Sequence, residues 1–271
     1  MSLSRLSFNQ ATARDWPLPE LVAGCVDAGI GQIGLWREQV GEFGLDRTAK
    51  LVASAGLGVS TLCRGGFFSG PDWLAENQRA IDEAAALGAP VLVLVSGGLP
   101  ARSRDVDGAR AHVADAIARL VPHATAAGVR LAIEPLHPMY ASDRCVISTL
   151  AQALDIAEGH PVAAVGVVVD TYHLWWDDTV YAQIARAGER IASFQLADWV
   201  TPLPQGVLTG RALPGEGCVE LDRLWRAVDA AGYTGPVEVE IFNADLWERS
   251  GAEILARTVR AYETVAAAVQ A

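Results

Sequence analysis

The sequence is poor in several features that mark common protein classes. No run of apolar residues approaches the ~18 residues that a membrane-spanning helix needs. The N-terminal segment MSLSRLSFNQ lacks the long apolar region of a secretory signal, so we expect a cytoplasmic protein with no membrane partner. The cysteines form no C-x-x-C pair, which argues against a cysteine zinc site or a redox motif.

Positive charge is also scarce. The formal net charge is -11 at pH 7, with 21 Lys and Arg against 32 Asp and Glu. A nucleic-acid partner is not expected, because binding to phosphates needs a stripe of basic residues that displaces counterions. Lysine is rare and no Walker-type glycine-rich loop is present, so a phosphorylated substrate is not required.

The remaining composition is that of a well-packed globular chain. Of the 271 residues, 51% are hydrophobic and 20% are charged, and no segment has the Pro/Ser/Gln bias of a disordered region. A length of 271 residues suits one large α/β barrel better than two ordinary domains. We therefore predict a single domain over residues 1–271.

Short β-rich runs alternate with longer helical patterns about eight times along the chain. The predicted strands are LSFNQ from Leu6, QIGLW, VSTLCR, VLVLVSGG, RLAIEP, VGVVVD, SFQLAD and VEVEIF. The clearest helices span Asp72–Leu87, Val106–Ala127, Ser148–Glu158, Leu221–Ala231 and Glu253–Ala268. This alternation predicts an α/β fold, the (β/α)8 TIM barrel. A doubly wound open sheet is the competing architecture, but no G-x-G-x-x-G follows the first strand.

Unusual polar residues end several strands in the second half of the chain, namely Glu134, Asp170, Gln195 and Glu240. In a (β/α)8 enzyme the carboxyl ends of the strands carry the active site. Alternation along VGVVVD points Val169 toward the helices and Asp170 into the barrel, and the same parity turns Glu134 and Glu240 inward. Three carboxylates and an amide oxygen are therefore expected to converge.

Converging carboxylates in a low-dielectric barrel repel one another unless a cation compensates them. We therefore predict one divalent metal ion at this point. Oxygen donors favour Mn²⁺ or Mg²⁺, whereas an imidazole would favour Zn²⁺ or Co²⁺. The alternative is that the four residues are separate, each with its own hydrogen-bond partners. Glu238, two residues deeper than Glu240, is expected to pair with Arg130 below the metal layer.

The segments AIEPLHPMYASDR, VVVDTYHLWWDD, FQLADW, RALPGEG and GPVEVEIFN, read in order, resemble the sugar phosphate isomerase/epimerase family with the xylose isomerase-like barrel. The resemblance spans nearly the whole chain. It implies that the metal ligands are Glu134, Asp170, Gln195 and Glu240. It also implies that Glu134 and Glu240 act as catalytic acid and base. The usual third ligand of this family is His, so Gln195 departs from the pattern with a neutral oxygen donor.

The same resemblance implies substrate contacts for His173, in a D-x-x-H pattern, and for Arg211, which precedes LPGEG. His137, in EPLHP, is either a third substrate contact or the cap of a rigid turn. Trp175 and Trp36 are expected to line the substrate pocket, as aromatic side chains at a barrel mouth do. LPGEG itself, Leu213 to Gly217, is a candidate lid.

These features predict a divalent-metal-dependent isomerase or epimerase of carbohydrate metabolism, with a sugar, a ketose or a related polyhydroxylated substrate. One Glu would remove a proton beside a carbonyl to give a metal-stabilised enediolate, and the other would return it. Loss of a β-hydroxyl group would instead make the chain a dehydratase, and a C-glycoside-cleaving lyase is a further alternative on the same site. A metal-dependent hydrolase and a non-catalytic sugar-binding barrel are further alternatives. Packing through surface helices would give a homodimer or a homotetramer.

Overall fold

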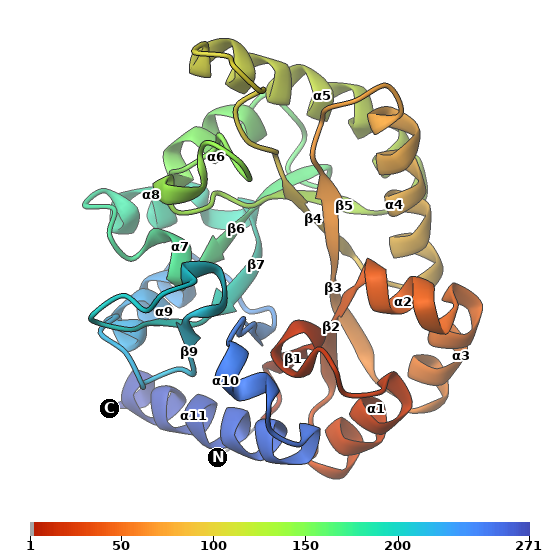
Figure 1. The fold of residues 1–271 in the computed structure, drawn as a ribbon, viewed down its shortest axis with the longest axis vertical. Helices are drawn as coiled ribbons and strands as arrows, with labels where there is room; N and C mark the ends of the chain where they lie inside the picture. The colour runs from red at the N-terminus through yellow and green to blue at the C-terminus, as the bar shows by residue number, and fades with distance from the viewer. Residues whose placement is uncertain (1–2) are drawn as a thin grey trace.

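The computed structural model describes residues 3–271, and its centre is a closed barrel of eight parallel strands (Figure 1). The strands follow one another around the barrel in chain order, and β1 pairs with β10 to close it. They are β1 (Leu6–Asn9), β2 (Gln32–Trp36), β3 (Gly58–Gly66), β4 (Val91–Val95), β5 (Arg130–Ile133), β6 (Val165–Asp170), β7 (Ile191–Leu196) and β10 (Val237–Val239). The predicted (β/α)8 barrel is confirmed, and a doubly wound open sheet is excluded because the ring has no free edge.

Helices cover the outside of this barrel, as Figure 1 shows. The α-helices are α1 (Leu18–Asp27), α2 (Arg37–Phe43), α3 (Leu45–Ser54), α4 (Trp73–Leu87), α5 (Val106–Ala127), α6 (Leu150–Ala157), α7 (Thr171–Leu174), α8 (Val180–Ala187), α9 (Leu221–Ala230), α10 (Ala244–Trp247) and α11 (Gly251–Gln270). Short 3-10 turns are η1 (Gln10–Ala13), η2 (Pro138–Tyr140), η3 (Gly188–Arg190) and η4 (Val207–Thr209). None of the described helices is long and apolar enough to cross a membrane.

The helix boundaries follow local capping chemistry. Helix α5 covers the predicted range, and Asp105 caps it by accepting the N–H of Gly108. Helix α11 starts at Gly251, ahead of the predicted Glu253, because the Ser250 hydroxyl accepts the N–H of Glu253 and fixes the first turn. Gly128 ends α5 in the left-handed conformation, with φ of 70°, which a glycine adopts without strain.

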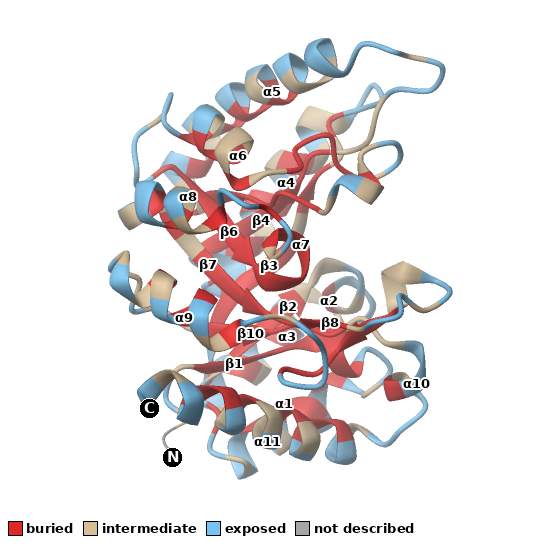
Figure 2. Ribbon diagram, turned by 90° about the vertical axis from the view of Figure 1, so that its left-hand side faces the viewer, coloured by how far each residue is buried: buried red, intermediate tan, exposed pale blue. Residues whose placement is uncertain are grey.

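Side chains alternate between the inside of the barrel and the layer under the helices. Val168 packs inside with Val93 and Ala132, whereas Val167 and Val169 belong to the larger cluster between strands and helices. The predicted parity of VGVVVD is therefore confirmed. Figure 2 shows the result as buried strands surrounded by helices whose outer faces are exposed.

A small antiparallel pair lies outside the ring and interrupts the βα repeat. It consists of β8 (Asp198–Trp199) and β9 (Arg211–Ala212), with Trp199 opposite Arg211. The pair follows β7, at the end of the barrel where Asp170 and Gln195 also lie. Through this pair, Arg211 approaches residues that belong to the barrel itself.

Candidate active site and metal centre

The strand-end residues that the sequence singles out come from four adjacent barrel strands. Glu134 directly follows β5, Asp170 ends β6, Gln195 lies in β7 and Glu240 directly follows β10. All four side chains are buried. Parallel strands bring their carboxyl ends to one end of a barrel, so four neighbouring strands deliver these groups to the same place.

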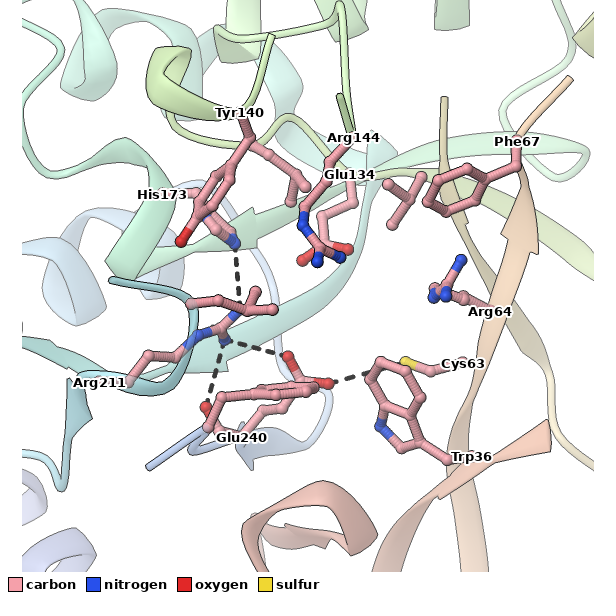
Figure 3. Close-up of a pocket in the computed structure, with 14 residues that line it drawn as sticks. Trp36, Cys63, Arg64, Phe67, Glu134, Tyr140, Arg144, His173, Arg211 and Glu240 are labelled. Atoms are coloured by element: carbon pink, nitrogen blue, oxygen red, sulfur yellow. Dashed lines mark hydrogen bonds and ion pairs between the residues drawn. The ribbon is translucent and has the colours of Figure 1, made fainter. Parts of the chain in front are cut away.

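A cavity of about 140 Å³ opens at this end of the barrel (Figure 3). Glu134 and Glu240 line it together with three other residues expected in the site, Trp36, His173 and Arg211. Asp170 and Gln195 lie behind its surface and are 0% and 1% exposed. The cavity is therefore bounded by the two carboxylates for which an acid and base role is expected.

Arg211 joins the acidic groups to one another. Its Nη1 donates to Oε2 of Glu240 at 3.1 Å and to Oδ2 of Asp170 at 3.4 Å. The rings of Tyr172 and Phe242 lie 4.8 and 4.9 Å from the guanidinium carbon. Although burial opposes its charge, the carboxylates of Asp170 and Glu240 raise the pKa of Arg211, which keeps it cationic.

Burial and mutual repulsion disfavour ionisation of the carboxyl groups. Burial raises the pKa of Glu240 to about 7, although the charge of Arg211 works in the opposite direction. Burial, together with the charges of Glu240 and Asp170, raises the pKa of Glu134 well above its ordinary range. Burial also raises the pKa of Asp170. One guanidinium is thus insufficient to keep all three groups charged.

His173 lies beside these carboxylates as a neutral imidazole. Burial, followed by the charge of Arg211, holds its pKa well below the ordinary value. Its Nδ1 lies 3.2 Å from the backbone nitrogen of His137, which can only donate a hydrogen bond. Nε2 lies 3.8 Å from Oδ2 of Asp170 and 3.1 Å from Nη2 of Arg211. Arg211 can also only donate, so the neutral imidazole that lines the cavity accepts from one of these two neighbours at a time.

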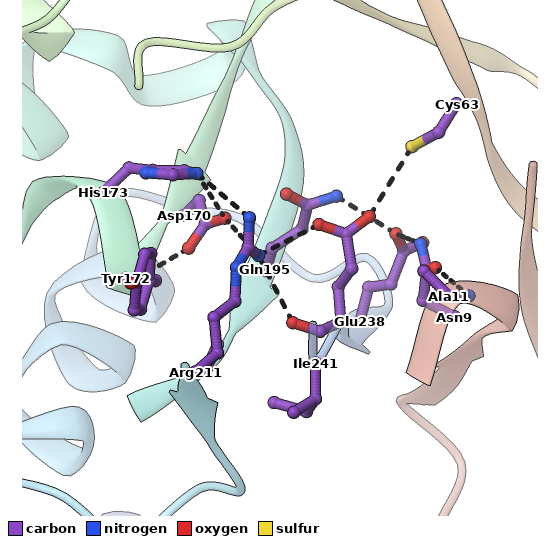
Figure 4. Close-up of polar contacts among 12 residues, drawn as sticks. Asn9, Ala11, Cys63, Asp170, Tyr172, His173, Gln195, Arg211, Glu238 and Ile241 are labelled. Carbon is purple, nitrogen blue, oxygen red and sulfur yellow. Dashed lines mark hydrogen bonds and ion pairs between the residues drawn. The ribbon is translucent and has the colours of Figure 1, made fainter. Parts of the chain in front are cut away.

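Gln195 provides a direct test of whether a metal fits this site. Its amide Nε2 donates to Oε1 of Glu238 at 3.1 Å, which fixes the direction of the amide. Its Oε1 is buried and has no hydrogen-bond partner in the described structure. A buried acceptor without a donor is costly unless a cation satisfies it. Figure 4 shows Gln195 between Asp170 and Glu238.

Other ligand atoms are also close together. One atom each from Glu134, Asp170 and His173 lies within 4.8 Å of the other two. The buried carboxylates, the surplus negative charge and the unpaired Oε1 of Gln195 therefore fit a divalent cation. The donor set consists mainly of oxygen atoms.

Glu238 does not pair with Arg130, so that expectation is wrong. Its carboxylate is 1% exposed and accepts hydrogen bonds from four neutral side chains, those of Asn9, Ser60, Thr61 and Gln195. Arg130 instead donates to the carbonyl of Glu189. Gly34 leaves room for this arrangement, because a Cβ there would lie 2.7 Å from Oε2 of Glu238.

His137 and Trp175 do not line the cavity, unlike the other expected substrate contacts. The ring of His137 packs 4.9 Å from that of Trp199, and Trp175 packs 5.4 Å from the same ring. His137 also accepts the N–H of Met139 through Nδ1, which is the turn-capping alternative considered for EPLHP. These two side chains form an aromatic layer behind the wall.

The cavity includes side chains that sequence patterns did not select. Arg64 and Phe67 come from β3 and the residue after it, Tyr140 comes from η2, and Phe242 follows β10. The sequence held a clue to Tyr140, because this residue lies in the AIEPLHPMYASDR segment that carries the family resemblance. Phe67 has a positive φ of 47°, a backbone feature that often occurs at functional sites but cannot be read from sequence.

The candidate lid, Leu213 to Gly217, is held by a buried carboxylate. Oδ2 of Asp198 accepts the N–H groups of Gly215 and Gly217 at 3.0 Å each, and Oδ1 accepts that of Val219. Asp198 is 1% exposed. The loop after Arg211 is therefore fastened to β8, which fixes the segment that carries this arginine.

Comparisons with known proteins show which family has this architecture. The model of the xylose isomerase-like TIM barrel family matches residues 22–262. The inosose isomerase of Halalkalibacterium halodurans is 28% identical over 131 residues, which are 47% of this chain and 45% of that protein. The 3-dehydroshikimate dehydratase of Pseudomonas aeruginosa is 33% identical over 175 residues, which are 63% of this chain and 26% of that protein. Each match spans less than half of the curated relative.

Solved structures extend the comparison to the whole chain. A protein of Sinorhizobium meliloti 1021 has a TM-score of 0.94 and 46% identity, over 97% of this chain and 99% of that chain. The IOLI protein, solved with a zinc atom, has a TM-score of 0.82 and 21% identity over 96% and 97% of the two chains, which shows a shared fold. Because the family model covers most of the sequence, the protein belongs to the xylose isomerase-like TIM barrel family.

Proposed function

We propose that this protein is a divalent-metal-dependent isomerase or epimerase of a sugar-like, polyhydroxylated carbonyl compound, with Glu134 and Glu240 as its acid and base. The observation that carries the proposal is that both carboxyl groups line one small cavity from different sides of the barrel. Without a cation, burial raises the pKa of Glu240 to about 7, and Glu240 also faces the cavity in which a substrate proton would be transferred. The curated relatives named as isomerase and dehydratase agree with an enzyme of this kind.

The buried oxygen atoms of Glu134, Asp170, Gln195 and Glu240 would hold the cation, with Mn²⁺ or Mg²⁺ preferred. When bound, such an ion supplies Lewis-acid stabilisation of negative charge on substrate oxygens. The absence of an imidazole among these four ligands is the reason to favour oxygen-preferring ions over Zn²⁺. The zinc atom of the IOLI structure makes Zn²⁺ the main competitor to test.

The side chains that line the cavity carry out the proton transfers and contact the substrate. One glutamate removes the proton from the carbon beside the substrate carbonyl, and the electron pair moves to the carbonyl oxygen to give an enediolate. The other glutamate returns a proton to the opposite face, which inverts the centre, or to the neighbouring carbon, which moves the carbonyl. His173 places its neutral imidazole beside the substrate oxygens, and Trp36 closes the wall of the cavity.

Dehydration is the second candidate reaction. The 33% identity to a 3-dehydroshikimate dehydratase covers more of this chain than the match to the inosose isomerase does. In that reaction the second glutamate would protonate a β-hydroxyl group, which leaves as water after the same C–H proton is removed. Product analysis separates the two outcomes, because only dehydration changes the composition of the substrate.

Proton exchange in D2O tests the proposal. We expect NMR to show deuterium entering one carbon position of a ketose or an inosose when metal-stripped protein receives Mn²⁺ or Mg²⁺. Glu134→Gln and Glu240→Gln should each lower the exchange rate by about 10²- to 10⁴-fold. Glu248→Gln, at an exposed acid outside the cavity, is the matched control and should keep the rate.

Two outcomes contradict the proposal in different ways. Normal exchange in both cavity variants would show that these carboxyl groups are not the acid and base. If no compound in a panel of ketoses, inososes and hydroxypyruvate exchanges a proton, hydrolysis, lyase chemistry or sugar binding without catalysis becomes the better explanation.

A further inference from the structure

Two arginines that line the cavity take no part in the proton transfer of the proposed reaction. Arg64, in β3, and Arg144, in the loop that follows η2, both line the cavity. Among the described residues, neither guanidinium group donates a hydrogen bond within the protein, in contrast to Arg211. Figure 3 shows Arg144 entering from the side of Tyr140 and Arg64 from the side of Phe67.

Each of these arginines forms one long ion pair with an exposed acidic group. Arg64 lies 4.0 Å from Oε1 of Glu38, and Arg144 lies 3.9 Å from Oδ2 of Asp143. The side chains of Glu38 and Asp143 are 59% and 64% exposed, so solvent screens both pairs. Neither arginine forms an ion pair with Glu134 or Glu240 in the described structure. Their charges are therefore available to a ligand.

The position of Arg64 is also fixed by stacking. Its guanidinium carbon lies 4.4 Å from the centre of the Phe67 ring and 6.0 Å from that of Trp36. A guanidinium that stacks on an aromatic face keeps the N–H groups at its edge free. Those N–H groups match the paired oxygens of a carboxylate or a phosphate.

Charge is distributed unevenly along the cavity. The deeper end holds Glu134, Glu240 and Arg211, which are at most 6% exposed. The side chains of Arg64 and Arg144, at 29% and 38% exposed, lie nearer to the solvent. An anionic group on a ligand would be repelled by the carboxylates at the deeper end and attracted to the arginines at the outer end.

We propose that the substrate carries an anionic group, a carboxylate or a phosphate, which Arg64 and Arg144 bind at the outer end of the cavity. This inference rests on the proposed function, because it assigns the deeper end to the hydroxylated carbons that react. It narrows the substrate class from polyhydroxylated carbonyl compounds in general to acids or phosphate esters of that class.

Two pairs of probes that differ in charge test the proposal by calorimetry. The first pair is 3-dehydroshikimate, which has a carboxylate, and inosose, a neutral hydroxylated ring ketone. The second pair is fructose 6-phosphate and fructose. Binding is measured on metal-stripped wild-type protein, whose expected lack of turnover without the cation lets affinity be read alone. We expect at least one anionic probe to bind ten times or more tightly than its neutral partner.

Variants at Arg64 and Arg144 then test whether these two residues cause the preference for anionic over neutral probes. Arg64→Gln and Arg144→Gln should each lower the ratio of anionic to neutral affinity at least about tenfold. Arg64→Lys, which keeps the charge but loses the paired N–H groups, should lower it less. Arg47→Gln is the matched control, because Arg47 also stacks on a phenylalanine, at 4.3 Å from the Phe43 ring, but lies outside the cavity.

Equal affinities within both probe pairs would overturn the proposal, as would selectivity that survives in the Arg64→Gln, Arg144→Gln double variant. The pair that shows the preference identifies the anionic group as carboxylate or phosphate. Failure of proton exchange with retained anion selectivity would refute the proposed reaction and leave this binding site standing.

Discussion

At the scale of single residues, Glu238 determines what Gln195 presents to the cavity end of the barrel. An amide side chain can offer either its oxygen or its nitrogen in a given direction. Glu238 accepts from Nε2 of Gln195 at 3.1 Å, so Oε1 faces the other way and remains unpaired. Partners of this kind, one step removed from a metal, orient its ligands and tune its affinity.

Two replacements of Glu238 test whether it orients Gln195 or only stabilises the fold of the barrel. Glu238→Gln keeps a carbonyl oxygen for Asn9 and Gln195 and turns an NH2 group toward Ser60 and Thr61, whose hydroxyls can rotate to accept. We expect it to lose less than about tenfold in Mn²⁺ affinity, whereas Glu238→Leu should lose about 10- to 100-fold. Isothermal titration measures both, with melting curves as the control for folding. Equal losses in the two variants would show that orientation of Gln195 is unimportant.

At the scale of elements, Asp198 fastens the loop between β9 and α9. Its two carboxylate oxygens accept four backbone N–H groups, one of them from the adjacent Trp199 and three from the loop. The loop that contains Pro and Gly would otherwise be a mobile turn. Because β9 pairs with β8, the same carboxylate holds Arg211 over Asp170 and Glu240.

Asp198→Asn should release this loop. The asparagine side chain has one oxygen acceptor, whereas two carboxylate oxygens accept the N–H groups in the native protein. Its NH2 group would also face other donors. We therefore expect the free energy of unfolding to fall by about 2–3 kcal/mol. Hydrogen exchange should speed up for residues 213–219. Asp178→Asn, at an exposed acid, serves as the control. Unchanged exchange in that loop would mean that packing, and not Asp198, holds it.

At the scale of the whole molecule, the buried acids oppose the stability that the barrel provides. Glu134, Asp170, Glu238 and Glu240 are all buried, and Arg211 is the buried cation that contacts two of them. Folding therefore brings like charges together in a poorly solvated place. A divalent cation that binds only the folded chain would offset this repulsion and stabilise the protein.

Stability without metal should consequently fall as the pH rises. The pKa of Glu240 is raised from its ordinary 4.5 to about 7, so its contribution to stability is complete below pH 4.5 and is lost as pH passes 7. Between these limits we expect the free energy of unfolding to fall by on the order of 3 kcal/mol. Urea unfolding of EDTA-treated protein measures the slope.

Two comparisons check the origin of this pH dependence. Glu240→Gln cannot ionise and should flatten much of the slope, and Mn²⁺ should restore stability at the upper end of the range. An unaltered slope in Glu240→Gln would assign the dependence to other groups. Failure of Mn²⁺ to raise the melting temperature would contradict a metal site in the barrel.

The sequence by itself determined the barrel and the residues at its strand ends. Strand and helix periods depend on local backbone geometry, and a parallel strand buried on both faces reads as an apolar run that ends in a polar residue. That was sufficient to place Asp170 at the end of β6 and to turn Glu134 and Glu240 toward one cavity. Capping residues such as Ser250 shifted only the helix ends.

Only the tertiary structure decided which groups meet across long stretches of chain. The partners of Glu238 come from β1, β3 and β7, and no local period reports such contacts, which is why Arg130 was wrongly expected. Loops have no period at all, so the sequence could not decide between the two alternatives for His137, whose ring packs behind the wall against Trp199. Side-chain direction beyond a strand end is set by packing among distant segments, and that packing exists only once the barrel has closed.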